Sequence, residues 1–347
     1  MTTMSVPARE SMRALSRIRH VRTLTVLVLL AVTAAVAVLA IGIGAVWVPP
    51  GRVLATIFGQ GTPAEQRILI NLRVPRVLCA LGVGAALAVS GVLLQAVTRN
   101  PLASPSVVGV NGGAGLGALV ALSFSAGSSA NTLVPVAAFA GAAVAGAASY
   151  LLARRGGIVN PGRLALIGVA IGGLTMALIQ LVIVLTLMSG DVQSALRWLT
   201  GSLWGRTWGN VGQLAPWVLV GLPLAWALAG PADVLGLGDD VPRSLGSRLE
   251  RLKVVLLAIA VGLAGSAVAV GGSIAFVGLV APHLCRKLVG PGHRLLIPAA
   301  ATFGGLLVLL ADTLGRAVIP PTEIPVGLFT ALIGAPYFLL QIRRGMS

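Results

Sequence analysis

Charged residues are scarce in this chain: of 347 residues, 10% are Asp, Glu, Lys or Arg, and only 9 are acidic. A soluble domain averages about 25% charged residues, whereas here 56% of the residues are hydrophobic and the mean hydropathy is +0.96. These values exclude a water-soluble fold. The formal charge is +16, but the basic residues are scattered between apolar runs without interleaved aromatics, which argues against binding of nucleic acid.

Residues that could form disulfides, bind metals or bind phosphate are equally few. The two cysteines, Cys79 and Cys285, lie in or beside apolar runs, so no disulfide framework is expected. His283 and Cys285 are two metal ligands on adjacent turns without a third, and no metal site is predicted. The only lysines, Lys253 and Lys287, do not follow a glycine, so the chain lacks a phosphate-binding GxxxxGK[ST] loop. The sequence therefore predicts neither an enzyme nor a cofactor in this chain.

Long apolar runs occupy most of the sequence. A bilayer core of about 30 Å takes some 20 apolar residues per helix, so runs free of Asp, Glu, Lys and Arg mark candidate membrane helices. They cover residues 23–51, 77–98, 100–153, 164–190, 207–232, 254–285, 295–311 and 324–342. The run 100–153 predicts two helices around a polar turn at 123–132. The run 254–285 is one long helix or two short ones broken at 271–273.

The basic residues distinguish nine spans from ten. With ten spans and a cytoplasmic N-terminus, 18 Lys and Arg face the cytoplasm and 7 face outward, whereas nine spans give 14 and 11. The positive-inside rule favours ten. We expect an all-α integral membrane protein with ten transmembrane helices: a cytoplasmic tail at 1–22, one transmembrane domain at 23–342 and a cytoplasmic tail at 343–347. The run 23–51 is longer than the roughly 7–15 apolar residues of a signal peptide, which indicates an uncleaved first span.

The 45 glycines indicate helices that approach closely through small residues. One weak repeat suggests two related halves: residues 84–91 match residues 265–272 at five of eight positions. In the ten-span arrangement these segments run in opposite directions, as in the inverted halves of many transporters. A chain this rich in Ala, Val and Gly also produces such similarity by chance.

Arginines concentrate unexpectedly in the first outer loop, which contains Arg52, Arg67, Arg73 and Arg76; Arg316 lies on the same side. One interpretation is interfacial snorkelling of the long side chains. The other is that Arg73 and Arg76, joined by Arg316, bind carboxylates of an external partner.

Two acidic residues, Asp312 and Glu323, flank the last outer loop. Acidic side chains near a membrane can couple transport to protons. Because both lie at span ends, a capping or loop-ordering role is favoured.

The longest cytoplasmic loop, about 231–250, predicts two short helices with Asp233 and Asp239 as N-caps and Gly236 and Gly238 as breaks. Its leucines either form a docking element for another protein or pack against the helix ends of this chain.

Several motifs recur together from about residue 50 to the end of the chain. They are RVPR (73–76), GAALAVSG (84–91), RNPLASP (99–105), WLTGSL (198–203), LGDDVPRSLG (237–246), GGSIAFVGLVAPH (271–283) and EIPVG (323–327). Together they resemble the permease subunits of the binding-protein-dependent ABC importers for ferric siderophores, haem and vitamin B12.

The resemblance implies a second permease subunit, identical or related, two ATPase subunits that carry ATP and Mg, and an extracytoplasmic substrate-binding protein, all at the cytoplasmic (inner) membrane. It assigns Arg73, Arg76 and Arg316 to docking of the binding protein. It assigns the cytoplasmic gate to Asn160, Pro161 and Gly162. The ATPase-coupling residues are Leu235, Gly236, Leu237, Gly238, Asp239, Asp240, Arg243, Leu245 and Gly246.

Ferric siderophores are the favoured substrate, and vitamin B12 or haem are the alternatives within the family. An ion-coupled secondary transporter is a rival of another class. It requires acidic residues embedded in the membrane and no docking loop, whereas this chain has few such acids and a docking loop.

Overall fold

A computed structural model describes residues 6–44, 46–124, 130–155, 158–186, 198–236, 247–319 and 322–345. The helices and strands are α1 (Val6–Gly42), α2 (Pro50–Ile57), α3 (Pro63–Ile68), the π-helical turn η1 (Leu69–Arg73), α4 (Val74–Thr98), α5 (Val110–Phe124), α6 (Ala130–Ala153), β1 (Arg154–Arg155), β2 (Ile158–Val159), α7 (Pro161–Thr186), α9 (Trp208–Ala227), α10 (Ala229–Leu235), α12 (Ser247–Gly271), α13 (Val277–Val289), α14 (His293–Ala317) and α15 (Val326–Gly345).

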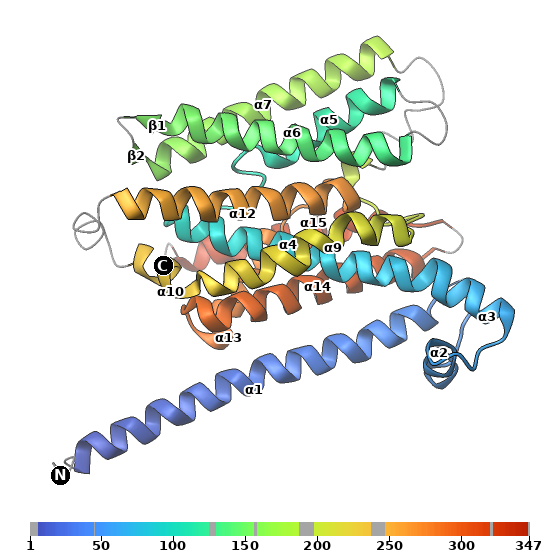
Figure 1. The fold of residues 1–347 in the computed structure, drawn as a ribbon, viewed down its shortest axis with the longest axis horizontal. Helices are drawn as coiled ribbons and strands as arrows, with labels where there is room; N and C mark the ends of the chain where they lie inside the picture. Colours follow the sequence, from blue (N-terminus) through green and yellow to red (C-terminus); the bar gives the residue numbers. More distant parts are fainter. Residues whose placement is uncertain are drawn as a thin grey trace.

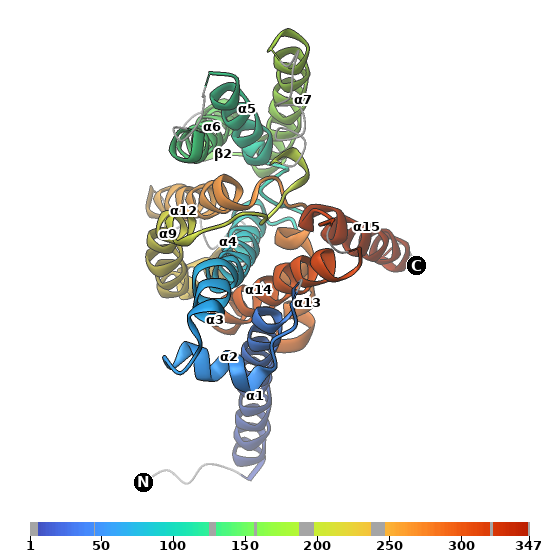
Figure 2. The same cartoon turned by 90° about the vertical axis from the view of Figure 1, so that its right-hand side faces the viewer.

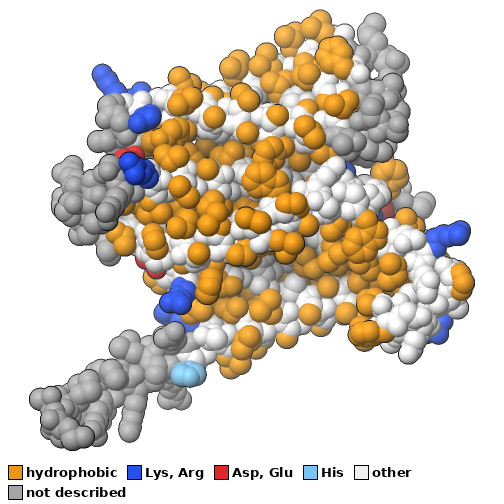
Figure 3. Space-filling model, in the orientation of Figure 1, with side chains coloured by type: hydrophobic (Ala, Val, Ile, Leu, Met, Phe, Trp, Pro, Cys, Tyr) orange, Lys and Arg blue, Asp and Glu red, His pale blue; other side chains and the backbone are white. Residues whose placement is uncertain are grey.

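The long helices lie side by side, so the bundle has two ends (Figure 1). The N-terminus, β1 and β2, α10 and the C-terminus lie at one end, here called the terminal end; α2 and α3 lie at the other, the α3 end. Figure 3 shows hydrophobic side chains over the middle of one face, with Lys and Arg toward both ends. This pattern suits a helix bundle in a bilayer.

Helix α4 is the centre of the bundle. Of the most apolar 18-residue stretch in the span that contains α4, 83% is buried within the chain. The corresponding value for the span formed by α7 is 17%. Helices α9, α12, α13 and α14 pack around α4, while α5, α6 and α7 form a second group that α12 joins to α4 (Figures 1 and 2). The exposed apolar surface of α1 and α7 is therefore left for lipid or for other subunits.

Glycines bring α4 into backbone contact with its neighbours. A Cβ atom on Gly84 would lie 2.1 Å from the carbonyl oxygen of Gly304 in α14, and one on Gly91 would lie 1.9 Å from that of Gly278 in α13. No larger residue fits at either crossing. The predicted packing through small residues is confirmed at the core.

The helix boundaries confirm both predicted divisions. Residues 100–153 contain α5 and α6, and residues 254–285 are divided between α12 and α13, with the break at Gly272–Phe276. The repeated segments 84–91 and 265–272 lie in α4 and at the end of α12, which pack together and run in opposite directions (Figure 1).

Six helices of the described residues are long and apolar enough to cross a membrane, and the bent pair α9 and α10 makes seven. Helix α5 has 15 residues and α13 has 13, which is short for a complete crossing. The chain is thus an all-α, multi-pass membrane protein apart from the hairpin of β1 and β2, in which Arg154 pairs with Val159.

Candidate functional site: charged clusters at the two ends of the bundle

An ionic cluster at the α3 end is centred on Arg76, in the first turn of α4. Its guanidinium donates to Asp312 of α14 at 2.8 and 3.1 Å and to Glu323 at 2.7 and 3.0 Å. The Asp312 side chain is 0% exposed and that of Arg76 13%. A buried carboxylate is tolerated only with charge-assisted bonds of this kind, so Arg76 fixes the first turn of α4 to α14.

Arg316 extends the cluster from the next turn of α14. Its Nε lies 3.2 Å from an Asp312 oxygen, as the spacing of four residues allows. Its terminal nitrogens donate to the carbonyl oxygens of Ile43 (3.0 Å) and Ala40 (3.3 Å), at the end of α1. Arg316 therefore joins α1 to α14.

Arg73, which lies in η1, binds the same end of α1. Its Nη1 donates to the carbonyl oxygens of Ile41 and Gly42 at 2.9 and 2.8 Å, and its Nη2 donates to Val46 at 2.7 Å. The last carbonyl groups of a helix have no partner within the helix, and Arg73 satisfies two of them.

The structure thus brings Arg73, Arg76 and Arg316 together, as the docking assignment requires, but turns their guanidinium groups toward partners within the chain. Snorkelling does not describe them either. The basic side chains exposed at this end include Arg52, which is 50% exposed and binds Glu65, and Arg67. Asp312 and Glu323 order this end by pairing with arginine, a role that the sequence suggested only in part.

At the terminal end, Asp233 ties α10 to α14. Its Oδ1 accepts a hydrogen bond from the backbone N–H of His293 (3.0 Å), the first residue of α14, and lies 2.6 Å from the Nδ1 of the same residue. The prediction that Asp233 is the N-cap of its own helix is wrong: Leu228 occupies that position, and Asp233 caps α14 across the interface.

The start of the predicted coupling segment packs against the chain itself. Leu235 ends α10 and is 1% exposed, whereas Gly236 is exposed. For Leu235 the interpretation of burial against this chain is therefore correct. The other coupling residues, Leu237, Gly238, Asp239, Asp240, Arg243, Leu245 and Gly246, lie outside the described residues.

The predicted gate lies at the same end, where the hairpin of β1 and β2 leads into α7. The Asn160 side-chain oxygen accepts from the N–H of Arg163 (3.1 Å) and so caps α7, while Pro161 occupies its first position. Glu250, in the first turn of α12, binds Lys253 at 2.6 Å and accepts from the backbone N–H of Val159 at 3.4 Å. Nothing in the sequence marked Glu250 as the residue that joins α12 to this hairpin.

Apolar helices with ionic cross-links at both ends define a multi-pass membrane protein. The chain belongs to the FecCD transport family, whose profile matches residues 27–344. The family predicted from the motifs is confirmed.

Three relatives illustrate the match. A permease protein of a ferric-citrate import system of Bacillus subtilis is 44% identical over 92% of this chain and 95% of its own. A cobalamin import permease of Halobacterium salinarum is 41% identical over 82% of this chain and 75% of its own length. A solved structure described as an inward-facing conformation of a transporter of the metal-chelate ABC type is 31% identical with a TM-score of 0.80, covering 92% of this chain and 98% of that one.

Proposed function

We propose that this chain is the permease that carries ferric siderophores across the cytoplasmic membrane in an ATP-driven importer. The observation that carries the proposal is the match, over nine-tenths of both chains, to a permease named for ferric-citrate import. The cobalamin permease makes vitamin B12 the second candidate, and haem is a third that shares the same motifs. The few acidic residues at membrane depth disfavour an ion-coupled transporter.

The proposed topology has ten transmembrane helices and both termini in the cytoplasm. The ten are α1, α4, α5, α6, α7, α9, α12, α13, α14 and α15. The short helices α5 and α13 are each preceded by non-helical backbone, at 99–109 and 272–276. Such backbone is compatible with a membrane where protein surrounds it. The hypothesis of two inverted halves is supported by the antiparallel packing of α4 and α12.

The proposed partners occupy the two ends and one side of the bundle. A second permease covers the side where α7 and α15 leave large apolar residues exposed, including Leu166, Val184 and Leu332. Two ATPase subunits, which carry ATP and Mg, bind at the terminal end around residues 235–246, and the turn at 160–162, between β2 and α7, acts as the gate. The binding protein docks at the α3 end, where Arg73, Arg76 and Arg316 hold the surface together.

The substrate proposal is tested by uptake under iron limitation in cells with and without the gene. Loss of labelled ferric-siderophore uptake, with vitamin B12 uptake unchanged, is the expected result. Loss of vitamin B12 uptake alone would overturn the substrate while keeping the family.

The docking proposal is tested by affinity for the binding protein. Arg76→Lys keeps the charge but loses the bidentate geometry, and the affinity should fall, whereas Arg52→Lys should leave it unchanged. A folded Arg76→Lys protein with unchanged affinity would restrict the cluster to a role in the fold.

A further inference from the structure

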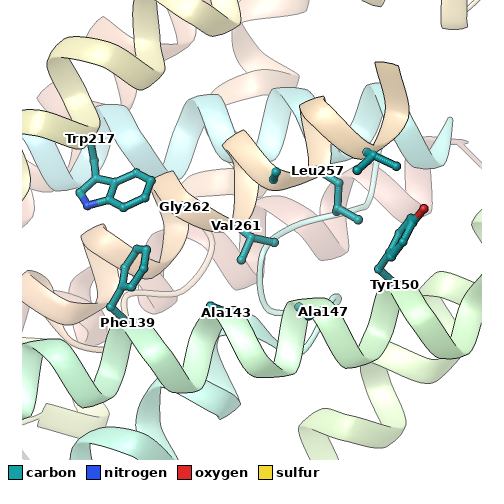
Figure 4. Close-up of a pocket in the computed structure, with 11 residues that line it drawn as sticks. Phe139, Ala143, Ala147, Tyr150, Trp217, Leu257, Val261 and Gly262 are labelled. Atoms are coloured by element: carbon teal, nitrogen blue, oxygen red, sulfur yellow. The ribbon is translucent and has the colours of Figure 1, made fainter. Parts of the chain in front are cut away.

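A groove on the outer surface of the bundle has no role in the proposed transport mechanism. It lies between α6 and α12 and is closed at one end by α9, with a volume of about 290 Å³ (Figure 4). Apart from Tyr150 its lining is apolar and includes Phe139, Ala143, Trp217, Val254 and Val261. Helices α9 and α12, which line the groove with α6, lie on the side of the bundle opposite α15, one of the helices proposed to face the second permease (Figure 2).

The groove has an apolar end and a polar end. The rings of Phe139 and Trp217 meet at the apolar end, with centroids 4.7 Å apart. Tyr150 lies at the polar end and comes from the last turn of α6, near the terminal end of the bundle (Figure 4). Tyr150 follows Phe139 by 11 positions, which is about 17 Å along a helix and close to half of a bilayer core of about 30 Å. The groove therefore matches one acyl chain in one leaflet.

Arginines lie just beyond the polar end. Arg154, the first residue of β1, directly follows the last residue of α6 and comes four positions after Tyr150, and Arg251 precedes Val254 by three residues on α12. Both are exposed. Arg154 pairs with Val159, whose N–H binds Glu250, the neighbour of Arg251. These two contacts bring both arginines to the same end of the groove.

The positive charge at this end is not balanced within the described part of the chain. Glu250 is the acidic residue there, and its Oε1 is bound by Lys253 at 2.6 Å. Neither Arg154 nor Arg251 forms an ion pair among the residues that the structure describes. An acyl-chain groove that ends at arginines with no ion pair in the described part of the chain fits a lipid with a negatively charged headgroup.

We propose that this groove binds an anionic phospholipid, with one acyl chain against Phe139, Val261 and Trp217 and the phosphate at Arg154 and Arg251. The lipid would fill the gap between α6 and α12 and tie the hairpin of β1 and β2 to α12. The inference does not depend on the transported substrate.

Quenching of tryptophan fluorescence by phospholipids brominated in the acyl chain tests the proposal on the full-length protein in phosphatidylcholine vesicles. The signal of Trp217 is isolated as the difference between the native chain and Trp217→Phe. Brominated phosphatidylglycerol should quench it at a mole fraction on the order of tenfold lower than brominated phosphatidylcholine.

Three variants separate the two parts of the site. The double variant Arg154→Gln and Arg251→Gln should abolish the preference for phosphatidylglycerol, whereas Arg343→Gln, an exposed arginine at the C-terminal end of α15, should keep it. Ala147→Phe, which fills the groove, should also remove the preference. Equal quenching by both lipids in the native chain, or a preference that survives either change at the site, would overturn the proposal.

Discussion

Arg76 and Asp312 lie 236 positions apart in the sequence, yet the Nη2 atom of Arg76 binds the Oδ1 atom of Asp312 at 2.8 Å. This contact holds the start of α4, the central helix, against the end of α14. The cluster around it, with Arg316 and Glu323, orders the α3 end, where the binding protein is proposed to dock.

Replacing Arg76 by glutamine should destabilise the permease strongly. Asp312 is fully buried, and breaking a buried ion pair by removing one partner typically costs about 3–5 kcal/mol. The same change at Arg52, whose pair with Glu65 is half exposed, should cost less than about 1 kcal/mol. Thermal unfolding of the two purified variants in one detergent makes the comparison, and equal losses would contradict a structural role for the Arg76 cluster.

Replacing Gly84 by alanine should also destabilise the protein, because the new methyl group would lie 2.1 Å from the backbone oxygen of Gly304. Overpacking of this kind costs about 1–3 kcal/mol. The matched control is Gly172→Ala in α7, where no atom beyond the adjacent residues and the surrounding helix backbone lies within 4 Å of the added carbon. The higher helix propensity of alanine should leave stability equal or raised by up to about 1 kcal/mol. Melting temperatures of the two variants measure the difference. If Gly84→Ala melts at the same temperature as the native chain, α4 and α14 do not cross as closely as described.

Asp233→Ala should loosen α10 from α14. The variant loses the cap on His293 and with it about 1 kcal/mol of stability. Asp233→Asn retains an oxygen that accepts the same backbone hydrogen bond, so most of that stability should remain. Protease cleavage between α10 and α12 is the readout, and equal cleavage of the two variants would show that the cap does not hold α10.

Glu250 should matter for coupling more than for folding. Its bond to the Val159 N–H joins α12 to the residue that precedes the turn at 160–162 proposed as the gate, so Glu250→Ala should lower substrate uptake per ATP hydrolysed in the assembled importer. The measurement is the ratio of the two rates in vesicles, with Val255→Ala, an exposed residue of the same helix, as the control for local disturbance. A ratio that is unchanged in Glu250→Ala would remove this residue from the coupling pathway.

Local sequence signals predicted the helices well but not the pairing of charges. The breaks at 123–132 and 271–273 follow from turn residues within long apolar runs, and the glycine crossings follow from composition. The spacing of four residues between Asp312 and Arg316 was visible in the sequence, but the bond from Arg76 to Asp312 depends on how α4 packs on α14. No local pattern encodes that packing, so arginines expected to face a partner instead satisfy groups within the chain.

Asp233 shows the same limit at the other end. Its residue type favours an N-cap, and it does cap a helix, but the helix is α14 and not its own. A propensity identifies what a side chain can bind, whereas the tertiary fold decides which backbone group it meets.

ATP-dependent uptake by the reconstituted importer tests the central claim most directly. The permease is inserted into vesicles with its ATPase and binding protein and is offered labelled ferric citrate, a labelled ferric hydroxamate or labelled vitamin B12. We expect a ferric chelate to accumulate only when ATP is present on the ATPase side, with no uptake of vitamin B12. Accumulation of vitamin B12 alone, or uptake that needs an ion gradient and no ATP, would contradict the account.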